Sequence, residues 1–120
     1  IASPNRAERS EMFKAIILLS RGENQSPDDF RRWWLTEHAP LARQLPGLRG
    51  LTFNLVTGPA AADGAADVPY DGVSELWFDS QEDFEAAYAT EIGKKVASDS
   101  LKHVSGRLRL IVEEHIQVPR

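Results

Sequence analysis

The side chain best suited to chemistry in this sequence is His38, which lies in a helical segment rich in aromatic residues. It follows Trp34 by four residues and Phe30 by eight, so on a helix it borders the apolar stripe that these rings form. An imidazole at that border titrates near neutral pH and could transfer a proton to or from a substrate held between helix and sheet. The structural alternative is a partly exposed histidine that stabilises a kinked turn by bonding to the Thr36 carbonyl. Periodicity does not separate His38 from Glu37, which projects nearly as close to the centre of the stripe.

Glu75 is the second candidate, because it interrupts the apolar run 73–78, which looks buried on both faces. A carboxylate in such a strand needs a hydrogen-bonding or cationic partner, since burial otherwise raises its pKa and neutralises it. Glu75 could therefore act as a catalytic base or as an anchor in a pocket. The structural alternative, which the pattern favours slightly, is an ion pair with Arg107 or Arg109 at a contact between subunits.

Aromatic residues could shape a cavity for an apolar or aromatic ligand around these two groups. The candidates are Trp34, Phe53 and Trp77, with Phe78 beside them, although aromatic residues at such spacings more often fill the core. Tyr70 closes a long connection and could lie at the mouth of the pocket, with a plain turn as the alternative.

Composition argues against several classes of function. These 120 residues contain no cysteine, so disulfides, thiolate metal sites and cysteine nucleophiles are ruled out. No two histidines have the spacing of metal ligands, and the sequence lacks both Gly-rich phosphate loops and the nucleophile elbow of serine hydrolases. We therefore expect no metal and no tightly bound cofactor.

Charge and hydropathy narrow the range of partners. The net charge is −4, the pI is about 5.3 and the basic residues are scattered, which argues against binding to nucleic acid or to a membrane surface. The longest apolar run, 15–19, is far too short to cross a bilayer. Together with the lack of cysteine, these features favour a cytoplasmic protein.

The periodicity of the chain predicts an α+β domain with the order β-α-β-β-α-β, which is the ferredoxin-like arrangement. Ser26 and Pro27 open the first helix, and Pro40 should kink or restart it because proline has no N–H to donate. Ser80 caps the second helix, whose apolar stripe continues past a break near Gly93. The predicted strands are 12–19, 48–57, 73–78 and 108–118.

Two segments do not belong to these elements. Residues 1–11 are polar and of mixed charge, and we interpret them as a disordered extension or a remnant of recombinant expression, with the domain spanning 12–120. Residues 58–72 form a long connection rich in Ala, Asp, Gly and Pro, of the kind that is functional or mobile. Within it, residues 60–67 should be the least ordered.

The first strand is apolar on both faces, whereas two helices can cover only one face of a four-stranded sheet. The second face therefore needs a partner of its own. The simplest partner is another copy of the chain, packed sheet against sheet as a homodimer.

Three stretches of the chain together resemble the EthD family. They are the opening strand 13–19, the helix 30–41 with its Glu-His-Ala-Pro followed by Leu-Pro-Gly-Leu at 45–48, and the segment 69–79, Pro-Tyr-Asp-Gly-Val-Ser-Glu-Leu-Trp-Phe-Asp. With the ending 112–115, the similarity covers nearly everything from residue 12 to residue 118. The resemblance implies a ferredoxin-like subunit that pairs into a dimeric α+β barrel, with a pocket between helices and sheet. It also implies functional roles for His38, Glu75 and Trp77.

The EthD family is loosely tied to oxidoreductase function in catabolic pathways. Related barrels include cofactor-free monooxygenases, polyketide cyclases, muconolactone-type isomerases and haem-degrading enzymes, and fold does not decide among them. We expect a small catabolic or biosynthetic enzyme, oxidoreductase-like by resemblance, that acts on an apolar or aromatic oxygenated molecule. His38 would be its general acid or base, Glu75 would orient or polarise the substrate, and Trp34, Phe53, Tyr70 and Trp77 would bind it. The alternatives are a non-redox cyclase, isomerase or decarboxylase, and a non-catalytic ligand-binding accessory protein.

Overall fold

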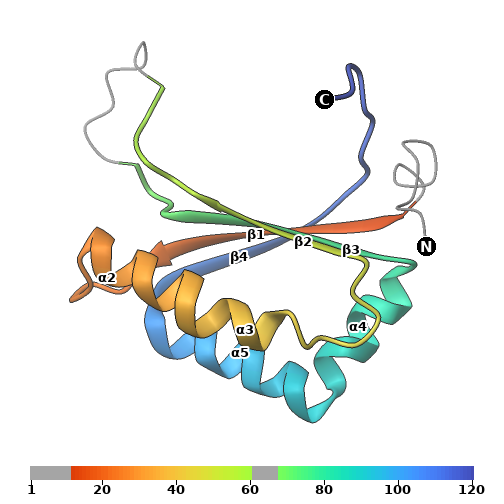
Figure 1. The fold of residues 1–120 in the computed structure, drawn as a ribbon, viewed down its shortest axis with the longest axis horizontal. Helices are drawn as coiled ribbons and strands as arrows, with labels where there is room; N and C mark the ends of the chain where they lie inside the picture. Colours follow the sequence, from red (N-terminus) through yellow and green to blue (C-terminus); the bar gives the residue numbers. More distant parts are fainter. Residues whose placement is uncertain (1–11, 61–67) are drawn as a thin grey trace.

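Four strands and a series of short helices make up the part of the chain that the computed structural model describes, residues 12–60 and 68–120 (Figure 1). The strands are β1 (Phe13–Arg21), β2 (Gly50–Leu55), β3 (Gly72–Phe78) and β4 (Val104–Val112). The helical elements are α2 (Pro27–Arg32), the wide π-helical turn η1 (Trp33–His38), α3 (Ala39–Ala42), α4 (Gln81–Ala89) and α5 (Glu91–His103). The predicted order β-α-β-β-α-β and the α+β class are confirmed.

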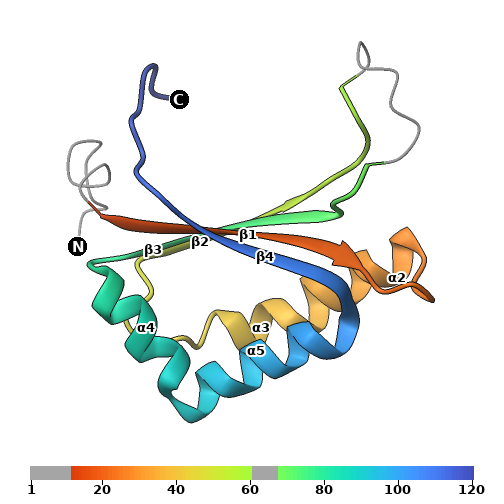
Figure 2. The same cartoon turned by 180° about the vertical axis from the view of Figure 1, so that it is seen from behind.

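The strands form an antiparallel sheet in the order β2-β3-β1-β4, and the helices cover one of its faces (Figures 1 and 2). β1 lies in the middle, where Ile16 is opposite Glu75 on one side and Leu110 on the other. The helix-facing residues of β1, Ala15 and Leu19 among them, are almost completely buried. A central strand of this kind explains why β1 is apolar on both faces.

The first predicted helix starts where the sequence indicates, but it does not restart at Pro40. Ser26 forms a complete capping box with Asp29: its hydroxyl accepts from the Asp29 N–H, and the Asp29 side chain accepts from the Ser26 N–H. At Pro40 the helix changes pitch without stopping: the π-helical turn η1 passes directly into α3, and Ala39 keeps helical geometry at φ −55° and ψ −43°. Thr36 in that turn donates its hydroxyl to the Arg32 carbonyl.

The break predicted near Gly93 lies three residues earlier, because α4 ends and α5 begins around Thr90. The Thr90 hydroxyl accepts from the Gly93 N–H and donates to the Ala87 carbonyl, so this one residue caps both helices. Gly93 itself is helical and buried. A β-carbon there would overlap the Ala87 carbonyl oxygen, so glycine is required for the close approach of the two helices and not for a break.

The last strand was predicted at 108–118, and both of those limits are wrong. β4 begins at Val104, because α5 passes into the strand without a loop. It ends at Val112, which pairs with Lys14, the second residue of β1, so β1 offers almost no length for the chain beyond it to pair with. The other three strands lie within two residues of their predicted limits.

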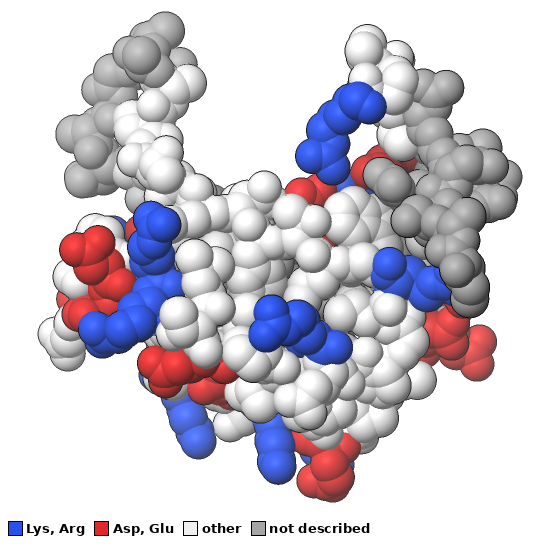
Figure 3. Space-filling model, in the orientation of Figure 1, with Lys and Arg blue, Asp and Glu red and all other residues white. Residues whose placement is uncertain are grey.

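Acidic and basic side chains are interspersed on the face of the molecule drawn in Figure 3, without a patch of one sign. No helix in the described ranges is long and apolar enough to cross a membrane. The predictions for residues 1–11 and for the segment 60–67 concern positions that, apart from residue 60, lie outside the described residues.

Candidate functional site

The π-helical turn η1 directs three large side chains to the interior. The Ala39 N–H donates to the Trp34 carbonyl five residues earlier, so the turn holds one residue more than an α-helical turn. Trp33, Trp34 and His38 are buried, whereas Glu37 is exposed. The structure thus distinguishes His38 from Glu37, which periodicity could not do.

Both imidazole nitrogens of His38 have partners on α5. Nδ1 lies 2.8 Å from Asp99 Oδ2, and Nε2 lies 3.3 Å from the Ser100 hydroxyl. A carboxylate only accepts hydrogen bonds, so the ring proton belongs on Nδ1 and Nε2 is the basic nitrogen. Only 5% of His38 is exposed to solvent. The ring therefore offers a proton acceptor in a fixed orientation.

Asp99 is itself held in place by aromatic neighbours. Trp33 Nε1 donates to the same Oδ2 atom over 3.1 Å. His103 stacks on Trp33 with ring centroids 4.7 Å apart, and its Nδ1 lies 2.8 Å from the Asp99 carbonyl oxygen. Trp33 also packs against the His38 ring at 4.9 Å. These contacts orient the carboxylate and, through it, the imidazole.

Burial lowers the pKa of His38 below its usual value of 6.5. The hydrogen bond and the negative charge of Asp99 act in the opposite direction, while the nearby His103 lowers the pKa slightly further. Because burial prevails, His38 is neutral at pH 7. A neutral imidazole is the form that can accept a proton from a substrate.

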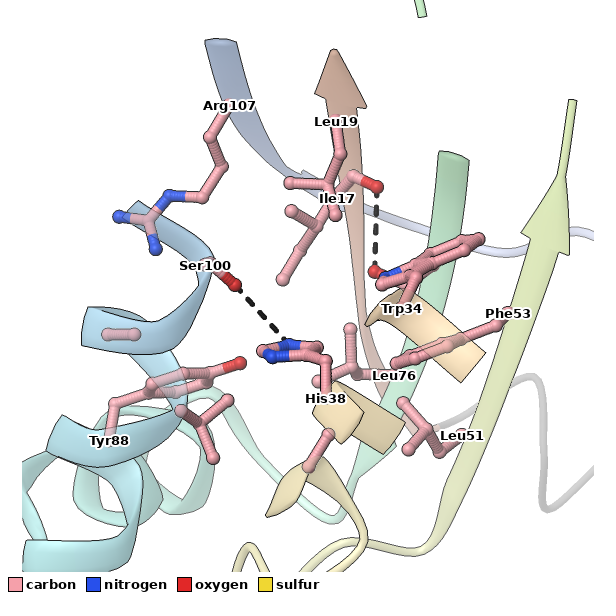
Figure 4. Close-up of a pocket in the computed structure, with 14 residues that line it drawn as sticks. Ile17, Leu19, Trp34, His38, Leu51, Phe53, Leu76, Tyr88, Ser100 and Arg107 are labelled. Carbon is pink, nitrogen blue, oxygen red and sulfur yellow. Dashed lines mark hydrogen bonds between the residues drawn. The ribbon is translucent and has the colours of Figure 1, made fainter. Parts of the chain in front are cut away.

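A narrow cavity lies beside His38, between the helices and the covered face of the sheet (Figure 4). Its solvent-accessible volume is about 20 Å³, within about 370 Å³ of space not filled by atoms. That is room for about one water molecule, so a larger ligand requires lining side chains to move. The apolar lining residues are Ile17, Leu19, Trp34, Ala42, Leu51, Phe53, Leu76, Val96 and Ala97.

The cavity has an aromatic side and a polar side. On the aromatic side, Trp34 and Phe53 stack almost in parallel, with ring centroids 4.4 Å apart. On the polar side are Tyr88, Ser100 and Arg107: the Tyr88 and Ser100 hydroxyls point toward His38, whereas the Arg107 guanidinium is turned toward α5 (Figure 4). Burial raises the pKa of Tyr88, which keeps its phenol protonated. A proton acceptor, hydroxyl donors and a guanidinium thus border one apolar space.

Glu75 does not lie in this cavity, because it points away from the helices. Along β3, Ser74 and Leu76 are buried against the helices, and Glu75 between them faces the other side of the sheet. There its carboxylate pairs with Lys14 Nζ at 2.9 Å and accepts from Asn54 Nδ2 at 3.0 Å. These hydrogen bonds outweigh the effect of burial and lower the pKa of Glu75.

The alternative prediction for Glu75, an ion pair with Arg107 or Arg109, is wrong. In the register of the sheet, Arg109 lies opposite Ile17, which faces the helices. The two arginines therefore lie on the covered face of the sheet, whereas Glu75 lies on the open face. Strand alternation explains why Glu75 and the two arginines are on opposite faces. Successive residues of a strand point to opposite faces of the sheet, and residues paired across two strands point to the same face.

The aromatic candidates are divided between three places. Trp34 and Phe53 line the His38 cavity, as described above. Trp77 lies on the open face, where Lys14 Nζ is 4.7 Å from its ring centroid. Tyr70 is half-buried and does not line the cavity; the adjacent Asp71 accepts hydrogen bonds from the Arg21 N–H and guanidinium.

Sequence reasoning missed four residues of this site: Tyr88, Asp99, Ser100 and Arg107. Asp99 and Ser100 lie in the second half of the predicted second helix, beyond its apolar stripe, and they adjoin no motif. Only their position on the inner side of α5, one turn before His103, could have indicated them.

No cluster of three His, Asp or Glu side chains within residues 12–60 and 68–120 could hold a metal ion.

Comparisons with known proteins agree with this architecture. An ethyl tert-butyl ether degradation family protein from Bacillus halodurans is 27% identical, with a TM-score of 0.74 over 87% of this chain and 99% of that one. A protein from Thermobifida fusca described as dimeric and ferredoxin-like is 18% identical, with a TM-score of 0.66 over 86% of this chain and 92% of that one.

A similar fold also occurs in SnoaB from Streptomyces nogalater, described as a cofactor-independent oxygenase. It is 12% identical, with a TM-score of 0.64 over 92% of this chain and 99% of that one. No curated protein matches the chain in sequence. The EthD domain, by contrast, matches residues 22–106, which include the cavity residues from Trp34 to Ser100 but not Ile17, Leu19 or Arg107. The resemblance noted in the sequence is thereby confirmed, and the chain belongs to the EthD family.

Proposed function

We propose that this chain is a small catabolic or biosynthetic enzyme in which His38 acts as general base and then as general acid on an apolar or aromatic oxygenated molecule. The observation that carries the proposal is the His38 ring, whose Nδ1 is anchored by Asp99 while Nε2 faces the cavity beside Ser100. Its lowered pKa supports the role of proton acceptor at neutral pH.

The reaction would begin with transfer of a proton from an acidic C–H or O–H group of the substrate to His38 Nε2. The electron pair of the broken bond stays on the substrate as an enolate-like or phenolate-like anion, and Asp99 stabilises the imidazolium that forms. The stacked rings of Trp34 and Phe53 form an apolar wall of the cavity against which the body of the molecule would pack. In the last step Nε2 returns the proton to the product.

Two continuations share this first step. In the oxidoreductase version, which we place first, dioxygen adds to the carbanion to form a C–O bond, and the resulting peroxide takes the proton from His38. Cleavage of its O–O bond with loss of the second hydrogen from the same carbon then gives a carbonyl group and one water molecule. The fold that the chain shares with an oxygenase described as cofactor-independent is compatible with this version. In the cyclase or isomerase version, the anion reacts within the same molecule and no oxygen is consumed. An accessory protein would bind the molecule without using the basic nitrogen.

The proton-transfer step can be tested with a simple carbon acid. In D2O, a base removes the hydrogens next to the carbonyl group of 2-tetralone, and their replacement by deuterium is followed by proton NMR. We expect the wild-type protein to accelerate this exchange. In His38→Ala the protein-catalysed exchange rate should be about 10²- to 10⁴-fold lower. His115→Ala is the matched control, because His115 is exposed and pairs only with Glu113. Equal rates for wild type and His38→Ala would contradict the proposal.

We also propose that a second copy of the chain covers the open face of the sheet. Leu108 and Leu110 are 45% and 40% exposed on that face, beside the half-buried Ile16 and Leu18 of β1. The C-terminal segment rises from the same side, away from the helices (Figures 1 and 2). An apolar sheet face of this kind is typical of a surface between subunits.

Unpaired polar atoms support the same partner. Trp77 Nε1 and Glu114 Oε1 are buried on or beside the open face, and neither has a hydrogen-bond partner among the described residues. A copy of the chain packed on this face could supply those partners while it covers the leucines. Obligate interfaces between subunits typically bury about 2,000 Å² or more in total.

A further inference from the structure

Two arginines of β4 lie on the covered face of the sheet, next to the candidate site. Arg107 and Arg109 are opposite Leu19 and Ile17 of β1, whose side chains face the helices. Arg107 lines the His38 cavity, and Figure 4 shows its guanidinium directed toward the side that holds Ser100 and Tyr88. A cation therefore borders a cavity that is otherwise mainly apolar.

Arg109 has its own partners within the fold. Its guanidinium lies 4.7 Å from the ring centroid of Tyr88 and 4.9 Å from that of Phe84. Stacking on aromatic faces stabilises this charge and holds it beside Arg107. The two arginines repel one another, and burial together with this repulsion lowers the pKa of Arg107, although a guanidinium remains charged at neutral pH.

Arg107 has no acidic partner within residues 12–60 and 68–120. The ion pairs of the described arginines involve Arg21, Arg32 and Arg49, and none includes Arg107. The whole chain has a net charge of −4 and eighteen acidic residues. A half-buried guanidinium without a carboxylate, in a chain rich in carboxylates, leaves a binding position for an anion from outside.

We propose that the molecule bound beside His38 is a carboxylate with an aromatic or apolar body, and that its carboxylate binds the Arg107 guanidinium. This inference rests on the proposed function, because it names the class of substrate for the same cavity. The planar guanidinium can donate two parallel hydrogen bonds to a carboxylate, which fixes the orientation of the molecule. Its ring system would then lie toward Trp34 and Phe53, with the reacting atom near His38 Nε2.

The same arrangement would help the proton transfer. Removal of a proton leaves additional negative charge on the substrate, and a guanidinium in a site that excludes water stabilises that charge. Arg107 would thus distinguish charged from neutral molecules and favour the anion formed by His38.

Benzoate and its neutral analogue benzamide form a matched pair of probes for this proposal. Binding is measured by NMR titration, in which the imidazole signals of His38 report occupancy of the cavity. We expect benzoate to bind about 10- to 100-fold more tightly than benzamide. Arg107→Gln should abolish this preference and Arg107→Lys should retain part of it, with the melting temperature showing that both variants fold. Arg43→Gln is the control, because Arg43 is exposed on the helical side and does not line the cavity.

Equal affinity for benzoate and benzamide, or an unchanged preference in Arg107→Gln, would overturn the assignment of a carboxylate substrate. If the wild-type protein nevertheless exchanges deuterium into 2-tetralone faster than His38→Ala does, the proposed function is still supported. If neither probe moves the His38 signals and the exchange does not depend on His38, both proposals fail.

Discussion

The Asp99 carboxylate lies 2.8 Å from His38 Nδ1, although the two residues are 61 positions apart in the chain. The turn η1 brings the imidazole inward, and α5 runs beside it, so that two helices from different halves of the fold meet at this hydrogen bond. The same carboxylate oxygen accepts from Trp33, which restricts its position. The basic nitrogen of His38 is therefore selected by a residue on another helix.

Asp99→Asn should lower the rate of 2-tetralone exchange by about 10- to 100-fold, because an amide can donate to Nδ1 and permit the wrong ring tautomer. The pKa of His38, measured by NMR, should fall further, since Asp99 raises it in the wild type. Asp79→Asn is the control: Asp79 is exposed and pairs with Arg49. A variant with reduced stability but an unchanged rate and His38 pKa would show that Asp99 is only structural.

The stability of the protein should depend on the protonation of His38. The folded-state pKa lies below the unfolded value of 6.5, so below pH 6.5 the unfolded chain binds more protons than the folded chain. The contribution of neutral His38 is thus fully present above pH 6.5 and decreases as the pH falls toward the folded-state pKa. Thermal melts from about pH 8 to about pH 5 should show this slope in the wild type and a weaker slope in His38→Gln. Identical slopes would mean that His38 is not buried in the neutral form.

Glu75→Gln should affect stability and not proton transfer. The carboxylate pairs with Lys14, whose side chain is 9% exposed, so we expect a loss of about 1–2 kcal/mol in the free energy of unfolding at pH 7. The pKa of Glu75 is lowered in the folded state, so the difference from wild type should disappear as the pH falls and the carboxyl becomes protonated. Urea unfolding at several pH values measures this effect. The rate of 2-tetralone exchange should stay at the wild-type level, and a decrease would place Glu75 in the reaction.

Gly93→Ala should destabilise the junction of α4 and α5. The new β-carbon would overlap the Ala87 carbonyl oxygen and lie 2.5 Å from Tyr88 Cα, so the two helices must separate. We expect a loss of about 2–4 kcal/mol in urea unfolding, whereas a helix interior would ordinarily gain from this substitution. Gly58→Ala is the matched control, since no atom lies within 4 Å of its added carbon. A stabilised Gly93→Ala protein would mean that the helices do not approach this closely.

Leu110→Glu should convert the proposed dimer into a monomer, because it places a charge among the apolar residues of the open sheet face, on the edge strand β4 opposite Ile16. Sedimentation of the wild type at micromolar concentration should give twice the mass of the chain, and the variant should give the mass of one chain. Leu101→Glu is the control, since Leu101 is 61% exposed on α5, on the helical side of the sheet. A wild-type monomer at this concentration would rule out the dimer.

Much of the fold could be predicted because the signals are local. The apolar pattern of β1 and the capping box of Ser26 with Asp29 each depend on residues within one element. His38 was identified in the same way, from its spacing to Trp34 on one helix. Predictions from local sequence failed where a contact between two elements determines the residue. Gly93, for example, is required by the close approach of two helices and does not mark the end of one.

The sequence by itself thus determined the family and the order of the elements, and it singled out His38 as a candidate, since each follows from neighbouring residues and their periodicity. Only the tertiary structure decided which side chains share a cavity with His38. Strand alternation directs Glu75 and Trp77 to the open face, and the packing of α5 and β4 brings Asp99, Ser100 and Arg107 to the imidazole. The physical reason is that facing and register across a sheet depend on pairing between distant segments, and no local pattern of residue types records that pairing.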